Sequence, residues 1–359
     1  MNWEKRIGKL RKKFGEKNIE AVLITNPANI FYLSGFTGSA GFIFAAPEKA
    51  YLITDFRYEE QAEKEISLQI FDLVICSTKI IDRIKDLVES ENIKRLGIEA
   101  KHMTVDFYNE LNEKLSRCSL IPVTGIVEEL RTVKDEEEID RIKKAAQIAD
   151  SAFDYIIKFI KPGLKEIEVA AEIEYFMRRN GASKASFDII AASGERSALP
   201  HGTAGERKLG NGNLLLMDFG AVYKGYCSDI TRTVVIGKAS EKQRKVYDIV
   251  FEAQNRALET AAVNMTCSEL DGLARSVIAE YGMGDKFGHS LGHGVGIEVH
   301  EAPAVSKNSR EVLSPGMVIT IEPGIYIKGW GGVRIEDMVL VTEKGLQVLT
   351  FSTKELLEI

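Results

Sequence analysis

Along the first part of the chain, short apolar runs of strand type alternate with stretches whose apolar residues recur at helical spacing. The runs AVLIT, GFIFAA, AYLIT, QIFDLVI and RLGIEA are rich in β-branched and aromatic residues, as strands are. The stretches Arg57 to Glu65 and Thr104 to Leu115 carry the helical pattern. This alternation predicts an α/β domain with a sheet of its own. The N-terminal stretch from Trp3 to Phe14 predicts an amphipathic helix and not a signal peptide.

The alternation breaks near Ile121 to Gly125, and a longer helical pattern follows. Asp135 is the expected N-cap of that helix, because Glu138 completes a capping box. Pro162 and Gly163 are expected to end it. We therefore place the domain boundary near residue 125, which gives an N-terminal domain over residues 1–125 and a second domain over residues 126–359.

The second domain repeats one pattern, in which a pair of helices precedes β-type sequence. The expected helices span residues 135–160 and 165–180 in the first copy. In the second copy a long helix starts at a cap formed by Ser240 with Gln243, and a shorter helix spans residues 268–281. The copies are offset by about 100 residues, which is too long for a solenoid repeat. We expect an α+β domain with an internal pseudo-two-fold repeat, whose halves face each other across a central cleft.

Four carboxylates and one histidine stand inside apolar, glycine-punctuated stretches of this second domain. They are Asp218, Asp229, His293, Glu322 and Glu336. Burying several like-charged carboxylates together is costly unless cations neutralise them. The sequence therefore predicts a metal site.

The first two acids lie in a predicted antiparallel hairpin. Its strands are residues 213–222 and 226–236, joined through Tyr223-Lys224-Gly225. With an even number of residues in the loop, Asp218 and Asp229 fall on one face, directly across or one diagonal apart; an odd loop without a bulge would separate them. The register decides between these arrangements.

The number and the kind of metal ions follow from the ligands. Four carboxylates and a neutral imidazole balance two divalent cations, and two carboxylates that bridge a metal pair are expected of a two-metal hydrolytic centre. Oxygen ligands with a single nitrogen favour Mn, Co, Fe or Zn in a site with open positions. The sequence does not choose among these metals.

Histidines are concentrated near the same acids. His201, His289, His293 and His300 lie in the half of the chain that carries the carboxylates. His201 and His300 are placed to donate hydrogen bonds to a developing oxyanion or a leaving nitrogen, if they reach it. His102 lies outside this group and is expected to be an ordinary histidine.

The combination MDFGAVYKGYCSDITRT, GHSLGHGVGIEVHE, IEPGIYI and GGVRIED resembles the pita-bread metallopeptidases, and within them the Xaa-Pro peptidases, aminopeptidase P and prolidase. The resemblance covers about residues 131–350, and LITDFRYEEQA more weakly resembles the first domain of Xaa-Pro peptidases and creatinase. It implies a creatinase-like N-terminal domain and a pita-bread catalytic domain. It also implies two divalent metal ions, with Mn expected.

The resemblance implies a role for each candidate residue. Asp218 would bind one metal, Asp229 and Glu336 would bridge, and His293 and Glu322 would complete the second metal. Glu322 would also take the proton of the attacking water. His201 would contact substrate near the cleaved bond, His300 would steady the tetrahedral intermediate, and His289 would line the proline pocket. Arg334 would support the ligands from outside. Its spacing of two from Glu336 puts both on one strand face, from which it could orient a ligating carboxylate.

Composition and charge limit the kinds of binding partner and compartment that are expected. A net charge of −6 argues against nucleic acid as the main partner. No apolar run approaches membrane-spanning length, and the four cysteines show no CxxC spacing, which suits a reducing cytoplasm. Cys227 is expected to be a core thiol. The resemblance implies a homodimer, to which Thr37, Phe56 or Arg57 would contribute near the partner's cleft.

Other functional classes share the expected fold. Metal-free creatinase and the peptide-binding relatives, including histone-chaperone subunits, lack the complete ligand set, and methionyl aminopeptidase usually lacks a leading domain of this size. The choice within the Xaa-Pro group is between an aminopeptidase, which cleaves longer peptides before a proline at the second position, and a dipeptidase. We choose the aminopeptidase, because no motif indicates capture of a dipeptide's carboxylate, and keep the dipeptidase as the alternative. The walls of the proline pocket, with Phe187 and Tyr326 as candidates, are not placed by the sequence.

Overall fold

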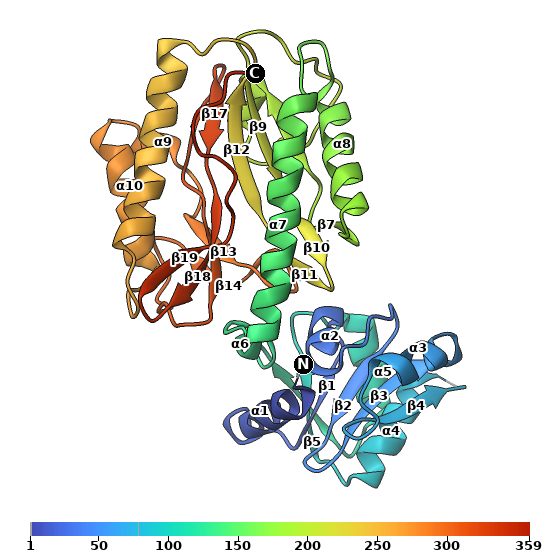
Figure 1. The fold of residues 1–359 in the computed structure, drawn as a ribbon. Coiled ribbons are helices and arrows are strands. Elements are labelled where there is room, and N and C mark those ends of the chain that lie inside the picture. Colours follow the sequence, from blue (N-terminus) through green and yellow to red (C-terminus); the bar gives the residue numbers. More distant parts are fainter. Residues whose placement is uncertain (1, 78) are drawn as a thin grey trace. The chain divides into compact units, whose positions relative to one another are not determined.

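The computed structural model describes residues 2–77 and 79–359. It divides into two compact units, Met1–Arg131 and Thr132–Ile359, which Figure 1 draws in the colours of the sequence. The sequence placed the boundary near residue 125, whereas the short helix α6 (Glu128–Arg131) still belongs to the first unit.

The first unit contains a six-stranded mixed sheet in the order β4-β3-β2-β1-β5-β6. The pairs β1–β5, β5–β6 and β3–β4 are parallel, and β2 runs antiparallel to both of its neighbours. The strands are β1 (Ala21–Ile24), β2 (Phe42–Ala45), β3 (Ala50–Asp55), β4 (Asp72–Cys76), β5 (Arg95–Glu99) and β6 (Ser119–Val123). The helices are α1 (Trp3–Glu16), α2 (Pro27–Ser34), η1 (Phe56–Tyr58), α3 (Glu59–Glu65), α4 (Ile80–Ser90) and α5 (Val105–Lys114). The predicted α/β class of this unit is confirmed.

The apparent break in the pattern near residue 121 is the last strand of this sheet. Pro122 lies exposed in β6, which is the edge strand beside β5. An edge position tolerates proline because the missing N–H would have faced solvent. The sequence pattern did not identify this strand for that reason.

The first half of the second unit begins with two helices, α7 (Glu136–Phe159) and α8 (Glu166–Arg179). Asp135 caps α7 in a capping box with Glu138, as predicted. The strands that follow are β7 (Lys184–Ala185), β8 (Ile190–Ser193), β9 (Leu214–Phe219), β10 (Ala221–Tyr223), β11 (Tyr226–Cys227) and β12 (Ile230–Val235), with the 3₁₀ helix η2 (Gly194–Ala198) after β8. They form two small sheets, β12-β9-β8 and β11-β10-β7.

The second half repeats this arrangement with α9 (Glu241–Thr260) and α10 (Cys267–Glu280). Ser240 and Gln243 form the predicted capping box of α9. The remaining elements are η3 (Gly284–Lys286), β13 (Gly292–Gly294), β14 (Glu301–Val305), β15 (Val318–Ile321), β16 (Gly324–Ile327), β17 (Gly331–Arg334), β18 (Asp337–Thr342) and β19 (Gly345–Val348). Their sheets are β14-β13-β15-β18-β19 and β16-β17.

Each helix pair covers its own group of strands. The buried residues of α7 and α8 form one core with β8, β9 and β12, and those of α9 and α10 form another with β15, β17 and β18. Figure 1 shows the strands between the two helix pairs, with α7 and α8 on one side and α9 and α10 on the other. The predicted pita-bread class with an internal repeat is confirmed, and the strands where the halves meet are those that carry the candidate ligands.

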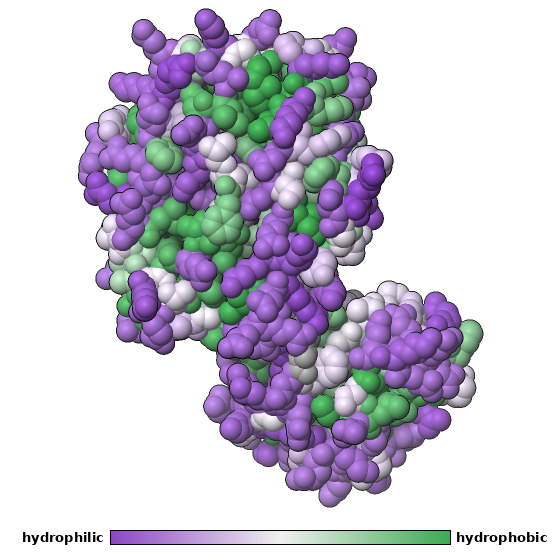
Figure 2. Space-filling model, in the orientation of Figure 1, coloured by the Kyte–Doolittle hydropathy of each residue, from purple (hydrophilic) through white to green (hydrophobic). Residues whose placement is uncertain are grey.

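Hydrophilic side chains cover most of the face shown in Figure 2, with apolar patches between them. Among the described residues, none of the helices is both long enough and apolar enough to span a membrane.

Candidate metal centre

The hairpin that carries the first two acids is bent in the middle of both strands. β9 pairs with β12 so that Asp218 lies opposite Thr231, which places Asp229 diagonally across from Asp218 on the same face. The tight turn contains only Lys224 and Gly225, both at positive φ, and not the three residues expected. Of the arrangements that the sequence left open, the structure has the diagonal one, with a shorter turn.

Gly220 makes the bend possible. A Cβ at this position would lie 1.8 Å from the Ser228 carbonyl oxygen, so no side chain fits. Ser228 fills the gap in the ladder, since its hydroxyl accepts from the Ala221 N–H at 2.9 Å. The bend directs Asp229, the next residue, toward the second half of the unit.

The other three candidates come from the second half. His293 lies in β13, Glu322 directly follows β15, and Glu336 connects β17 to β18. His293 Nε2 lies 3.6 Å from Asp229 Oδ2 and 3.3 Å from Glu322 Oε1. One ligand atom each from Asp229, His293 and Glu336 lies within 4.8 Å of the others. Side chains from both halves thus converge at one point.

The convergence point opens into a cavity of about 530 Å³. All nine residues predicted from the sequence line it: Asp218, Asp229, His293, Glu322, Glu336, His201, His289, His300 and Arg334. Phe187, Ile190, Pro200, Thr203 and Ala304 provide further walls, and Asp188 lies among them. Among these additional lining residues, the sequence suggested only Phe187 as a candidate. The others are mostly small or apolar, and such residues carry no chemical signal in a sequence.

The acids of the centre repel one another. Burial raises the pKa of Asp229 well above its usual value, and the charges of Glu336, Asp218 and Glu322 add to the effect. Burial likewise raises the pKa of Glu336, together with the charges of Glu322 and Asp218. Burial alone would raise the pKa of Glu322 too, but the hydrogen bond and charge of His293 lower it. A cation among these groups would relieve the repulsion.

Two carboxylate oxygens of the centre have no hydrogen-bond partner. Asp218 Oδ1 and Asp229 Oδ1 are both buried from solvent. A buried, unsatisfied oxygen is costly in a folded protein, and coordination to a metal ion satisfies it. The residues present therefore fit a centre for divalent cations.

Neighbouring groups orient the proposed ligands. The His293 Nδ1 atom lies 3.1 Å from the Gly294 carbonyl, so Nε2 faces the carboxylates. The Thr231 hydroxyl donates to Glu336 Oε2 at 2.7 Å, and the Thr320 hydroxyl donates to Glu322 Oε1 at 3.1 Å. Such outer contacts fix the rotamers of metal ligands.

Arg334 contacts the carboxylate of Asp218, one of the proposed ligands. Its Nη2 donates to Asp218 Oδ2 and Nη1 donates to the Tyr326 hydroxyl at 2.8 Å. Glu336 lies beyond the end of β17, where the period of two no longer holds, so the sequence did not show which carboxylate Arg334 contacts. Arg334 reaches Glu336 only through Thr231, whose hydroxyl accepts from Arg334 Nε at 3.0 Å.

The three other histidines that line the cavity lie at different places in it. The ring of His300 lies 4.2 Å from that of His293 between centroids. His289 Nε2 lies 2.9 Å from the Tyr326 hydroxyl, which places Tyr326 behind His289. His201 is exposed, with no hydrogen bond from its ring to another described residue, so the ring is available to a substrate. Burial lowers the pKa of both His289 and His300.

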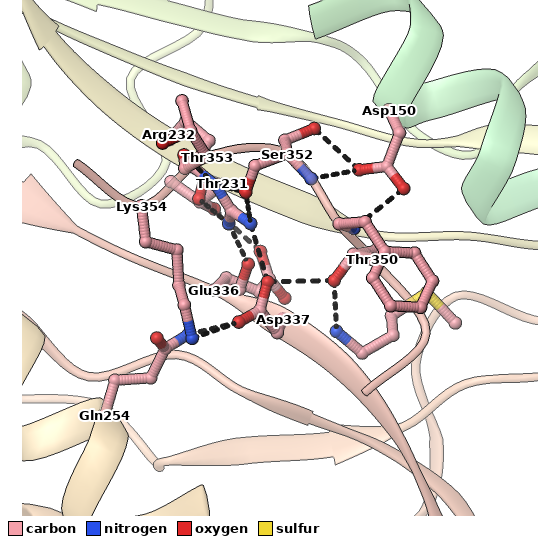
Figure 3. A network of polar contacts seen from close by, with 12 residues as sticks. Asp150, Thr231, Arg232, Gln254, Glu336, Asp337, Thr350, Ser352, Thr353 and Lys354 are labelled. Carbon is pink, nitrogen blue, oxygen red and sulfur yellow. Dashed lines mark hydrogen bonds and ion pairs between the residues drawn. The ribbon is translucent and has the colours of Figure 1, made fainter. Parts of the chain in front are cut away.

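A buried polar network behind Glu336 was not predicted from sequence (Figure 3). Arg232 donates to Asp337 Oδ1 at 2.6 Å and to the Ser352 carbonyl at 2.8 Å. Lys354 Nζ lies 3.0 Å from Asp337 Oδ2. The arginine in the motif DITRT was a usable signal, since a charged residue in an apolar strand needs a buried partner.

Comparison with known proteins agrees with this fold and site. Residues 140–343 match the model of metallopeptidase family M24, and residues 6–133 match the creatinase/prolidase N-terminal domain. The chain is 45% identical to the Xaa-Pro dipeptidase of Pyrococcus furiosus over 99% of this chain and 100% of that protein.

Two solved structures extend the likeness. An Xaa-Pro dipeptidase from Bacillus anthracis superimposes with a TM-score of 0.98, at 47% identity over 100% of both chains. An X-Pro aminopeptidase from Thermotoga maritima gives 0.90, at 40% identity over 95% of this chain and 98% of that one.

The chain belongs to metallopeptidase family M24. It is a metal-dependent peptidase with a creatinase/prolidase N-terminal domain. The resemblance inferred from the motifs is thereby confirmed.

Proposed function

We propose that this chain is an Xaa-Pro dipeptidase, which hydrolyses the bond between an N-terminal residue and a following proline. The main support is the convergence of five ligand-type side chains in one cavity, in a chain 45% identical over its length to an Xaa-Pro dipeptidase. The dipeptidase, held as the alternative on sequence grounds, takes precedence over the aminopeptidase because such relatives are named dipeptidase or prolidase.

Asp218, Asp229, His293, Glu322 and Glu336 would hold two divalent ions. Mn is the expected metal, and Co, Zn or Fe are the alternatives. Bound divalent ions supply an activated water near neutral pH and polarise the scissile carbonyl.

Side chains that line the cavity transfer the proton, stabilise the intermediate and recognise the proline. Glu322, on the cavity wall, accepts the proton of the attacking water and passes it to the leaving proline nitrogen. His300 and His201 donate hydrogen bonds to the tetrahedral intermediate and to the substrate near the cleaved bond. His289 and Phe187 bound the space for the proline ring, which offers no N–H and must be recognised by shape.

One observation favours the aminopeptidase as a second candidate. Among the described residues that line the cavity, Arg334 alone carries a guanidinium or ammonium group, and it is paired with Asp218. In an Xaa-Pro dipeptide the proline itself carries the free carboxylate. Among the lining residues that the structure describes, no unpaired arginine or lysine is available to bind that carboxylate. A longer peptide makes no such demand.

The Mn-loaded protein tests both candidates when it is given an Xaa-Pro dipeptide and the matching Xaa-Pro-Yaa tripeptide. A higher kcat/KM for the dipeptide supports the dipeptidase. A higher kcat/KM for the tripeptide would favour the aminopeptidase instead. If neither peptide is cleaved, the protein is not an Xaa-Pro peptidase.

We also propose a homodimer in the cytoplasm. The four cysteines are unpaired and buried, as is common for chains in a reducing compartment, and Cys227 is the core thiol expected. Phe56 is 75% exposed in the first unit, which suits a contact with a second copy. Arg57 is bound to Asp55, and Thr37 is bound to Glu65, so these two residues already have partners within the unit.

A further inference from the structure

Two buried carboxylates outside the metal centre hold the two loops that carry His201 and His289. We call residues 193–205 the His201 loop and residues 287–291 the His289 loop. Each carboxylate lies on the second helix of its half, Glu166 at the start of α8 and Asp271 within α10. Both are fully buried.

Glu166 contacts both ends of the His201 loop. Its Oε1 accepts from the Ser193 N–H at 2.7 Å and from the Ser193 hydroxyl at 2.8 Å. Its Oε2 accepts from the Gly205 N–H at 3.2 Å. One carboxylate thus closes the loop at its base.

The same carboxylate also organises the middle of that loop. Arg196 pairs with Glu166 Oε2, and its Nη2 donates to the Thr203 carbonyl at 2.7 Å. Thr203 and Pro200 line the cavity on either side of His201. Because the His201 ring has no hydrogen bond to another described residue, the loop backbone is what places it.

Asp271 makes the corresponding contacts in the other half. It accepts two hydrogen bonds from Arg275, at 2.7 and 2.8 Å, and one from the Leu291 N–H at 3.0 Å. Arg275 in turn donates to the Phe287 carbonyl at 2.7 Å and to the His289 carbonyl at 2.9 Å. A carboxylate and an arginine again fix the backbone around a cavity histidine.

We propose that Glu166 and Asp271 are positioning residues, each of which holds one cavity histidine, His201 or His289, where the substrate requires it. Each carboxylate is fully buried, and its arginine is about a quarter to a third exposed. A buried carboxylate with several hydrogen-bond donors is suited to fixing one conformation of its loop. Neither carboxylate lies in the cavity, so each acts through its loop. The inference rests on the proposed function, in which both histidines contact substrate.

Hydrogen exchange of the backbone amides tests the loops without any activity assay. Glu166→Gln is expected to speed exchange in residues 194–205 and to leave residues 287–291 unchanged, and Asp271→Asn is expected to do the reverse. Glu174→Gln is the matched control, because Glu174 lies on α8 and pairs with Arg178 at the surface. Unchanged exchange in both loops would overturn the proposal.

Kinetics then test whether the loops act through the histidines. Glu166→Gln should lower kcat/KM for an alanyl-proline dipeptide about 10- to 100-fold, with Mn affinity unchanged by calorimetry. In a His201→Ala background, Glu166→Gln should lower kcat/KM by less than about twofold. In a His289→Ala background it should still lower kcat/KM about 10- to 100-fold. Asp271→Asn should lower kcat/KM little in the His289→Ala background and by its usual factor in the His201→Ala background.

Equal losses in both backgrounds would show a general structural role and overturn the proposal. If Glu166→Gln does not fold, Ser193→Ala removes one of the same hydrogen bonds and takes its place. An inactive wild-type protein would refute the proposed function instead, and the exchange measurement would still decide whether the carboxylates hold the loops.

Discussion

A single threonine hydroxyl connects the two sides of the metal centre. Thr231 donates to Glu336 and accepts from Arg334, which itself holds Asp218. Thr231→Val keeps the shape of the side chain and removes both contacts. We expect Mn affinity to fall about 10- to 100-fold, as for other outer contacts of metal ligands, measured by calorimetry on the chelator-treated protein.

Thr233→Val is the control for this change. Thr233 lies two residues further along β12, is equally buried, and hydrogen-bonds to the backbone of Arg334. Its loss should lower stability by about 1–3 kcal/mol with little change in Mn affinity. Equal effects of both variants on Mn affinity would count against a specific role of the Thr231 hydroxyl.

At the scale of residues, the sequence predicted identities better than contacts. The acids at positions 218, 229, 322 and 336 were recognisable, because charged side chains in apolar strands need a reason to be there. The partner of Arg334 was not, because it depends on where β17 ends. The buried Arg232 and Asp337 were missed because their pairing joins residues 105 positions apart.

At the scale of elements, Asp150 on α7 binds the backbone of the segment that follows β19. Its carboxylate accepts from the Phe351 N–H and the Ser352 N–H, both at 2.8 Å, and from the Ser352 hydroxyl at 2.6 Å (Figure 3). Asp150→Ala should lower the free energy of unfolding by about 1–3 kcal/mol, because three donors, two of them partly buried, lose their acceptor. Chemical denaturation measures this, with the exposed Asp154→Ala on the same helix expected to change it by less than about 0.5 kcal/mol.

Two glycines of the second unit should respond to alanine in opposite directions. Gly220→Ala would collide with the Ser228 carbonyl and is expected to destabilise the fold by about 3 kcal/mol or more. Gly272 lies exposed within α10 with nothing within 4 Å of a Cβ, so Gly272→Ala is expected to stabilise by about 0.5–1 kcal/mol. Thermal unfolding of the two variants checks both signs. A stable Gly220→Ala protein would show that the bend in β9 and β10 is not required.

Elements with a strong local signal were predicted well. Capping boxes at Asp135 and Ser240 identified the starts of α7 and α9, because the caps are made by neighbours in sequence. The strand β6 and the helix α2 were missed. α2 begins with a proline and has only eight residues, and β6 contains a proline that only its edge position explains.

At the scale of the whole catalytic unit, the proposed metal centre lies between two halves that each have a core of their own. Asp218 and Asp229 come from strands of the first core, and His293, Glu322 and Glu336 come from elements beside the second. The offset of the repeat predicted this division, since two copies of one motif enclose a cleft between them. Sequence alone did not show how the strands of the two copies meet, because that depends on packing between distant residues.

Removal of the metals should therefore loosen the contact between the halves as well as stop catalysis. Ions that bind only the folded unit stabilise it by about 4 kcal/mol when present at a thousand times their Kd. Without them, the repulsion among the buried carboxylates of Asp229, Glu322 and Glu336 returns. We expect dialysis against a chelator to abolish peptide hydrolysis and to lower Tm by several degrees, and added Mn to restore both. Asp229→Asn and Glu336→Gln remove part of that repulsion, so in the metal-free protein they should raise Tm, although each lowers Mn affinity. If chelation leaves Tm unchanged while activity is lost, the ions serve chemistry alone and the two halves are held together by apolar packing.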